Sequence, residues 1–167
     1  MCDSGIFKVE GTKGISLHDG GTIYAHVFFQ ESSTPPGKPR KYDGICFKRD
    51  EFLLGRNLDG IYFNMFLDGK WSVKAPLPKF PIGKWVDIAV TVTKGPERYD
   101  IVYYVDGVEV QRANAAFGAQ IPPGARTDLQ IGTCWGTEWL FGGKLDKLFI
   151  YDRPLSAEEV KGLSGAE

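Results

Sequence analysis

Residues 101–110 read Ile-Val-Tyr-Tyr-Val-Asp-Gly-Val-Glu-Val, and this stretch decides the fold class. The β-branched and aromatic residues on both sides of Asp106-Gly107 favour extended strands. An Asp-Gly pair between two such runs is typical of a tight turn that joins neighbouring antiparallel strands, because both turn residues must adopt positive φ. The stretch therefore predicts a β-hairpin. A second pair, Asp68-Gly69, lies between runs of the same kind and predicts another hairpin.

The same pattern extends over the whole chain. Short runs of β-branched and aromatic residues alternate with Gly, Pro, Asn and Asp, which is typical of an all-β domain. Strands are expected at residues 5–9, 22–30, 44–49, 60–67, 70–74, 85–94, 100–105, 108–112, 128–133 and 143–151. Loops are expected at the proline-rich stretches 32–40 and 75–81, because proline cannot donate to a strand ladder.

One helix is predicted at the C-terminal end of the sequence. Ser156 and Glu159 have the spacing of a capping box, and Leu155 precedes the cap as a hydrophobic staple would. Strands followed by one short helix in 167 residues fit a single hydrophobic core. We therefore expect residues 1–167 to form one antiparallel β-sandwich of two sheets, present as a monomer.

Composition excludes several classes of function. The formal net charge of -1 gives no basic footprint for nucleic acid. No apolar run approaches the roughly 20 residues of a membrane helix, so no membrane insertion is expected. The three cysteines, Cys2, Cys46 and Cys134, match no zinc-ligand spacing. Cys46 lies in an apolar stretch and is interpreted as a small buried hydrophobe rather than a reactive thiol.

The C-terminal residues 143–160, Gly-Lys-Leu-Asp-Lys-Leu-Phe-Ile-Tyr-Asp-Arg-Pro-Leu-Ser-Ala-Glu-Glu-Val, closely resemble the closing signature of laminin G-like domains of the concanavalin A-like jelly-roll fold. Gly83-Lys-Trp-Val-Asp-Ile-Ala-Val-Thr-Val92 is similar to another strand of this family, and Tyr104-Val-Asp-Gly107 to its Tyr-x-Asp-Gly hairpin. Thr22-Ile-Tyr-Ala-His-Val27 fits an early strand, with His26 where tryptophan is common. The resemblance extends from about residue 5 to residue 163.

This resemblance implies a non-catalytic module that binds a polysaccharide or other glycan. Domains of the family are often attached to secreted bacterial glycosidases, sialidases and sulfatases. We therefore expect a module of a larger extracellular or cell-surface protein, with other domains of the parent chain as further partners. The alternative is a structural or protein-interaction module without a glycan ligand.

The fold also includes enzymes, and two catalytic hypotheses are less favoured. The Glu-x-Asp-x-x-Glu motif of its glucanases does not occur in the sequence. The acidic pairs Asp50-Glu51 and Glu158-Glu159 are expected to be solvated charges. A polysaccharide lyase with His26 as base and Tyr104 as acid is a further alternative, although the strand motifs of alginate lyases are missing.

Candidate carbohydrate-binding residues follow from strand alternation, because successive side chains of a strand point to opposite faces. Five of them are expected to share the solvent-facing side of one sheet: Tyr24, His26, Tyr62, Asn64 and Tyr104. The alternative is that these rings bury one another or lie under loops.

Tryptophans supply the other candidate binding residues. Trp135 and Trp139 lie in a glycine-flanked loop, where they could bind a ligand or cap the core. Trp71 follows the first turn and extends the expected platform. Trp85 occupies the family's structural strand entry and is assigned to packing.

Asp146 is the candidate metal ligand. It has the same strand parity as the apolar Leu148 and Ile150, and an inward-facing carboxylate needs a partner. Relatives of this fold often hold a structural Ca²⁺ at this position, so the resemblance implies calcium at Asp146. The second acidic residue often found beside it is Lys147 in this chain.

Overall fold

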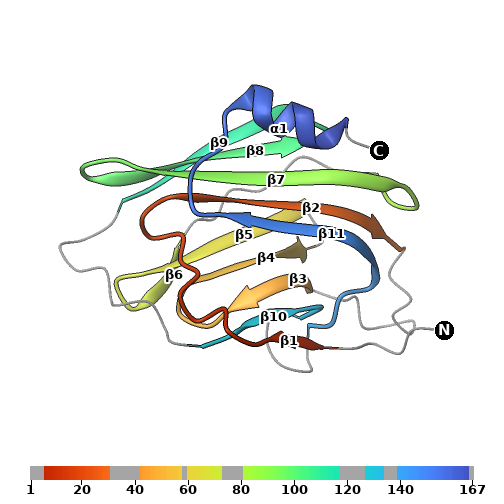
Figure 1. Cartoon of the computed structure of the whole chain (residues 1–167), viewed down its shortest axis with the longest axis horizontal. Coiled ribbons are helices and arrows are strands. Elements are labelled where there is room, and N and C mark those ends of the chain that lie inside the picture. The colour runs from red at the N-terminus through yellow and green to blue at the C-terminus, as the bar shows by residue number, and fades with distance from the viewer. Residues whose placement is uncertain are drawn as a thin grey trace.

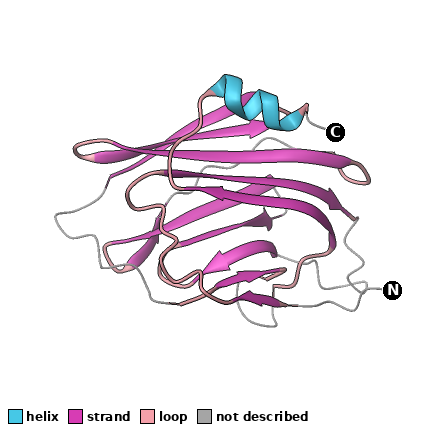
Figure 2. Cartoon of the chain, viewed as in Figure 1, coloured by secondary structure: helices cyan, strands magenta, loops and turns pink. Residues whose placement is uncertain are grey.

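The computed structural model describes residues 6–30, 42–57, 60–72, 81–116, 127–133 and 139–165. Its strands are, in chain order, β1 (Phe7–Val9), β2 (Gly21–Phe29), β3 (Tyr42–Lys48), β4 (Phe52–Asn57), β5 (Gly60–Leu67), β6 (Lys70–Ser72), β7 (Trp85–Lys94), β8 (Arg98–Val105), β9 (Val108–Ala116), β10 (Leu129–Ile131) and β11 (Gly143–Tyr151). The helix α1 (Ala157–Ser164) follows the last strand (Figures 1 and 2). The prediction of an all-β fold with a C-terminal helix is confirmed.

The strands form two antiparallel sheets. Sheet A has the order β1-β10-β3-β4-β5-β6, and sheet B has the order β11-β2-β7-β8-β9. β11 pairs with β2, so segments from opposite ends of the chain lie side by side (Figure 1). The helix α1 lies over sheet B near β8 and β9. No helix among the described residues is long and apolar enough to span a membrane.

Both predicted hairpins are confirmed. Asp68-Gly69 joins β5 to β6, and Asp106-Gly107 joins β8 to β9. The φ angles are 50° and 75° in the first turn and 48° and 73° in the second. Positive φ at both central residues is what a two-residue turn of this twist requires, and Asp-Gly adopts it readily.

The layer between the sheets contains the predicted apolar residues of three strands. Each of them is at most 3% exposed: Ile23, Ala25, Val27, Phe29, Ile61, Phe63, Met65, Leu67, Val86, Ile88, Val90 and Val92. The face of each sheet that points away from this layer is called its outer face below.

β4 was not predicted, because a charged residue interrupts its apolar pattern. Arg56 points inward, where it forms an ion pair with Asp43 and donates to the carbonyl of Gln30 at 3.1 Å. Its guanidinium also lies 5.1 Å from the centre of the Phe29 ring. These partners make a buried cation tolerable at the end of the sandwich.

The prediction that Glu51 is solvated is wrong. Its side chain is buried, accepts a hydrogen bond from the Ser16 hydroxyl at 2.8 Å and lies 3.5 Å from Nδ1 of His18. The neighbouring Lys48 is also fully buried and donates to the carbonyls of Lys13, at 2.9 Å, and Ile15. Burial lowers the pKa of Lys48 and raises that of Glu51. This polar cluster attaches residues 13–18 to β3 and to the turn between β3 and β4.

We predict that Lys48→Met destabilises the fold. The substitution keeps an apolar side chain of similar length but leaves two carbonyls without their donor, at a cost of about 2 kcal/mol or more. Urea denaturation of the variant should show a lower midpoint than the wild type. The exposed Lys70→Met is the control, and equal midpoints for both variants would contradict the assigned role of Lys48.

A second prediction concerns the pH dependence of stability. Burial raises the pKa of Glu51 above its ordinary 4.5, so the folded state binds this proton more tightly than the unfolded state. The resulting stabilisation is present below about pH 4.5 and is lost as pH rises through the folded pKa. Glu51→Gln should therefore gain stability relative to the wild type over that pH range, measured by urea midpoints. The exposed Glu158→Gln should track the wild type, and a constant offset for Glu51→Gln would refute the linkage.

Candidate functional site

Aromatic side chains gather on the outer face of sheet A. Phe47 and Leu53 are buried there, and the partly buried rings of Tyr62, Trp71 and Trp139 pack against them. This cluster is separate from the core between the sheets. We call the following six residues the aromatic platform: Tyr42, Phe47, Tyr62, Phe66, Trp71 and Trp139.

The rings of the platform hold one another in place. Tyr42 lies between Trp139, at 4.4 Å between ring centres, and Tyr62, at 5.4 Å. Trp71 similarly contacts Phe66 at 5.2 Å and Phe47 at 6.1 Å. Such tilted and edge contacts are the arrangements that aromatic pairs favour.

Backbone features of β3 and β4 explain how rings from separate segments meet. Gly44 pairs directly with Gly55, so neither strand projects a side chain at that step. The rings of Tyr42 and Tyr62 can therefore approach each other across two strands. The backbone N–H of Gly44 donates to the carbonyl of Trp139 at 3.1 Å and fixes the loop that carries this tryptophan.

Four of the predicted binding residues share this face. Tyr62, Trp71 and Trp139 belong to the platform, and Asn64 lies at its base, where its amide donates to the Tyr62 hydroxyl. The prediction missed Tyr42, because it lies between the proline-rich loop predicted at residues 32–40 and the strand predicted at residues 44–49. The available signal was its position two residues before Gly44, because residues two apart in a strand share the same face. Trp135 lies outside the described residues.

The expectation that five binding residues share one sheet is wrong. Tyr62 and Asn64 are on sheet A, whereas Tyr24, His26 and Tyr104 are on sheet B. All five lie at outer-face positions, as alternation predicted. Alternation determines which face of a strand a residue occupies, but it does not determine which sheet the strand joins.

The helix α1 covers Tyr24 and Tyr104. These tyrosines are 2% and 5% exposed and pack with Leu155 and Val160 of the C-terminal segment. The Tyr24 hydroxyl donates to Oδ1 of Asp87 at 2.6 Å, and burial raises the pKa of both tyrosines. Neither ring is accessible to a ligand. The burial of Tyr104 also argues against the lyase hypothesis, in which this tyrosine would act as the acid.

Trp85 is exposed, so its assignment to packing is wrong. Val86 and Ile88 point inward from β7, which places Trp85 on the outer face of sheet B, and 43% of its surface is accessible. The indole stacks on the imidazole of His26, with 4.8 Å between ring centres and 3° between planes.

Asp146 does not point into the apolar layer, as the calcium prediction assumed. The register of β11 shifts between Leu145 and Lys147, so Asp146 lies in a bulge and its side chain is exposed. The described residues contain no group of three His, Cys, Asp or Glu side chains that could hold a metal ion. The inward-facing carboxylate on which the calcium expectation rested is therefore not observed, and calcium at Asp146 stays a prediction.

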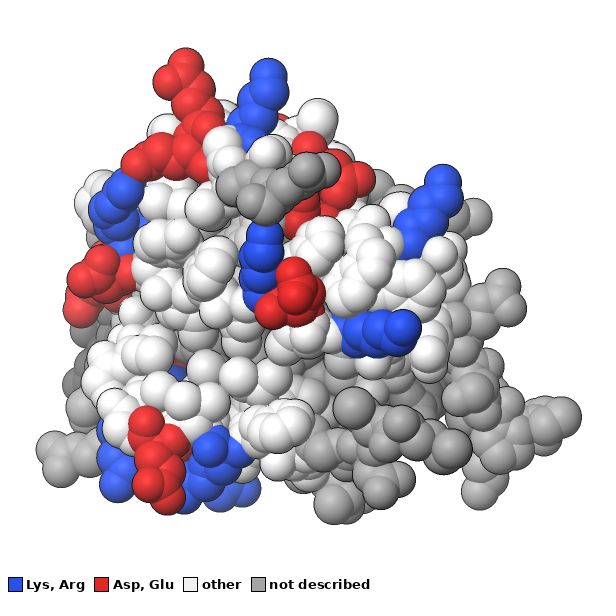
Figure 3. Space-filling view, turned by 45° about the vertical axis from the view of Figure 1, so that its right-hand side comes forward, with Lys and Arg blue, Asp and Glu red and all other residues white. Residues whose placement is uncertain are grey.

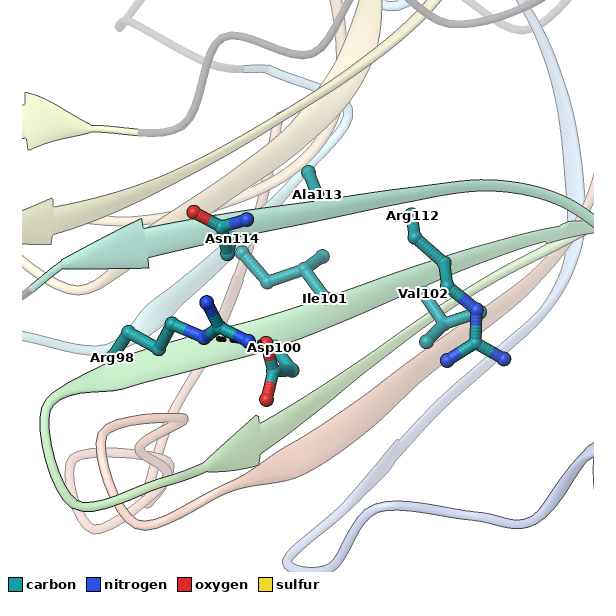
Figure 4. A pocket seen from close by; sticks show the side chains of 7 residues that line it. All are labelled: Arg98, Asp100, Ile101, Val102, Arg112, Ala113 and Asn114. Atoms are coloured by element: carbon teal, nitrogen blue, oxygen red, sulfur yellow. Dashed lines mark ion pairs between the residues drawn. The ribbon is translucent and has the colours of Figure 1, made fainter.

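A pocket of about 380 Å³ lies on the outer face of sheet B, between β8 and β9 (Figure 4). Arg98 pairs with Asp100 at 3.1 Å, and Arg112 pairs with Glu109 at 2.6 Å. Both guanidinium groups already have carboxylate partners, so the pocket has no strong preference for an anion. Figure 3 likewise shows acidic and basic side chains interspersed on the face it presents.

Residues 19–161 match the family described as the concanavalin A-like lectin/glucanases superfamily, Laminin_G_3. A search of curated protein sequences gave no match. Among solved structures, domain 4 of AbnA, a GH43 extracellular arabinanase from Geobacillus stearothermophilus in complex with arabinotriose, has 19% identity and a TM-score of 0.64, covering 91% of this chain and 69% of its own.

Two further structures show the same fold. The CBM40 of the Ruminococcus gnavus IT-sialidase, bound to alpha2,3 sialyllactose, has 16% identity and a TM-score of 0.62 and covers 88% of this chain and 83% of its own. Botulinum neurotoxin type C, whose cell entry depends on interaction with two ganglioside molecules, has 14% identity and a TM-score of 0.64 over 95% of this chain and 38% of its own. The chain belongs to the concanavalin A-like lectin/glucanase superfamily.

Proposed function

We propose that this chain is a non-catalytic carbohydrate-binding module that holds a glycan on the aromatic platform. The observation that carries the proposal is the gathering of partly exposed rings, Tyr42, Tyr62, Trp71 and Trp139, on one sheet face. The C–H face of a sugar stacks on flat rings, and its hydroxyl groups pair with polar groups at their edges.

The platform offers both kinds of contact in a preorganised form. The hydroxyl groups of Tyr42 and Tyr62 can donate or accept, and the indole N–H groups of Trp71 and Trp139 donate. Because each of these rings already packs against another ring, binding would immobilise few additional side chains. Low ordering cost favours affinity.

The charges of this face support a binding role without catalysis. Hydrolysis of a glycoside uses two carboxyl groups placed across the scissile bond. The described outer-face positions of β3, β4, β5 and β6 contain no Asp or Glu. Asp43, the acidic residue of β3, points inward to Arg56.

The structural relatives support the same class of ligand. The arabinanase domain and the sialidase CBM40 were each solved with an oligosaccharide. We extend to this chain only the class, a glycan, together with a place in a larger extracellular or surface protein whose other domains supply its further partners.

We predict that Tyr62→Ala and Trp139→Ala each weaken glycan binding. A screen on a glycan array would select the ligand, and isothermal titration calorimetry would then measure affinity. Loss of one stacking ring should cost about 1 kcal/mol, a rise in Kd of roughly fivefold.

Phe7→Ala is the matched control, since Phe7 is an exposed aromatic residue on the edge strand of the same sheet. It should leave the Kd unchanged. The proposal fails if no glycan binds, or if both platform variants bind with wild-type affinity.

A further inference from the structure

A second aromatic surface lies on the outer face of sheet B, beside the area that α1 covers. Trp85, at the start of β7, is its most exposed ring. Phe28 is its direct neighbour on β2, and His26 is its diagonal neighbour. On the other side of β2, Lys144 of β11 pairs with Phe28. We call His26, Phe28, Trp85 and Lys144 the Trp85 surface.

The indole ring of Trp85 is supported by two neighbouring rings and remains partly accessible. His26 stacks in parallel on one face of the indole at 4.8 Å, and Phe28 meets it edge-on at 5.7 Å. The residue as a whole is nevertheless 43% exposed. A supported ring that remains partly accessible is a stacking platform for one sugar ring.

A buried carboxylate orients the histidine of this surface. Oδ1 of Asp87 accepts hydrogen bonds from Nδ1 of His26 and from the Tyr24 hydroxyl, both at 2.6 Å. A carboxylate only accepts, so Nδ1 of His26 carries a hydrogen, and in the neutral imidazole Nε2 is the nitrogen that accepts from a ligand. The imidazole is 29% exposed, and the described residues give Nε2 no hydrogen-bond partner.

Lysines of β11 add positive charge next to the rings. The ammonium of Lys144 lies 5.6 Å from the centre of the Phe28 ring. Lys147 is directly opposite His26 in the strand register of β11 and β2. The carboxylates of the exposed Asp146 and of Asp87 offset these two charges, so the cation offered to a ligand is the ammonium of the exposed Lys144. The surface thus combines a partly accessible ring, a hydrogen-bond acceptor for a hydroxyl group and one exposed ammonium group.

We propose that the Trp85 surface is a second glycan-binding site, specific for a sugar that carries a carboxylate. The sugar ring stacks on Trp85, a hydroxyl group donates to Nε2 of His26, and the carboxylate pairs with Lys144. The site is on the other sheet from the aromatic platform, so both can be occupied at once.

The probes are trigalacturonic acid and sialyllactose, each paired with an uncharged counterpart, the methyl ester of trigalacturonic acid and lactose. Titration calorimetry on the full chain should show that at least one acid binds and that its counterpart binds at least tenfold more weakly. Trp85→Ala and Lys144→Ala should each raise the Kd of that acid at least fivefold. Lys144→Ala leaves every ring in place, and circular dichroism verifies the fold of both variants.

Tyr62→Ala separates this site from the aromatic platform, because it should leave the affinity for the acid at Trp85 unchanged. The inference is overturned if neither acid binds, if acid and counterpart bind equally, or if Trp85→Ala and Lys144→Ala retain wild-type affinity. It is also overturned if sedimentation shows a dimer that Trp85→Ala abolishes, since the surface would then be a protein contact.

Discussion

The apolar layer between the two sheets is the constraint on which the rest of the molecule depends. Burial of each large apolar side chain contributes about 1.5–3 kcal/mol, and twelve inward positions of β2, β5 and β7 are nearly inaccessible. A slip of one residue in any of these strands would turn its apolar side chains to solvent. The register is therefore fixed by the core, and the outer faces inherit their side chains from it. The rings of Tyr62 and Trp85 are held in place by residues on the opposite side of their own strands.

The two outer faces differ because the chain continues past β11. Leu155 and Val160 place α1 on sheet B, where the helix covers Tyr24 and Tyr104 and divides that face. Within the described residues no helix packs on sheet A, so its rings pack on one another and remain partly accessible. The last residues of the sequence thus decide which aromatic residues can meet a ligand. Asp87 links the covered and uncovered parts of sheet B, since it binds both Tyr24 and His26.

Local sequence predicted the features that local chemistry controls. Asp68-Gly69 and Asp106-Gly107 specified their turns, and the capping box specified α1. Features that depend on distant partners could not be predicted. The charged Arg56 prevented the prediction of β4, because its ion-pair partner Asp43 is on another strand. Glu51 is buried only because residues 13–18 fold over it. Strand alternation placed Tyr62 on an outer face but could not separate its sheet from that of Tyr24.

Whether the outer face of sheet A receives the glycan can be tested by ¹⁹F NMR of the chain labelled with 5-fluorotryptophan. Single Trp→Phe variants assign the four resonances. On titration with an uncharged oligosaccharide that binds, we expect the signals of Trp71 and Trp139 to shift with saturation while that of Trp85 stays in place. If the oligosaccharide binds while the signals of Trp71 and Trp139 both remain unchanged, the aromatic platform is not the binding site.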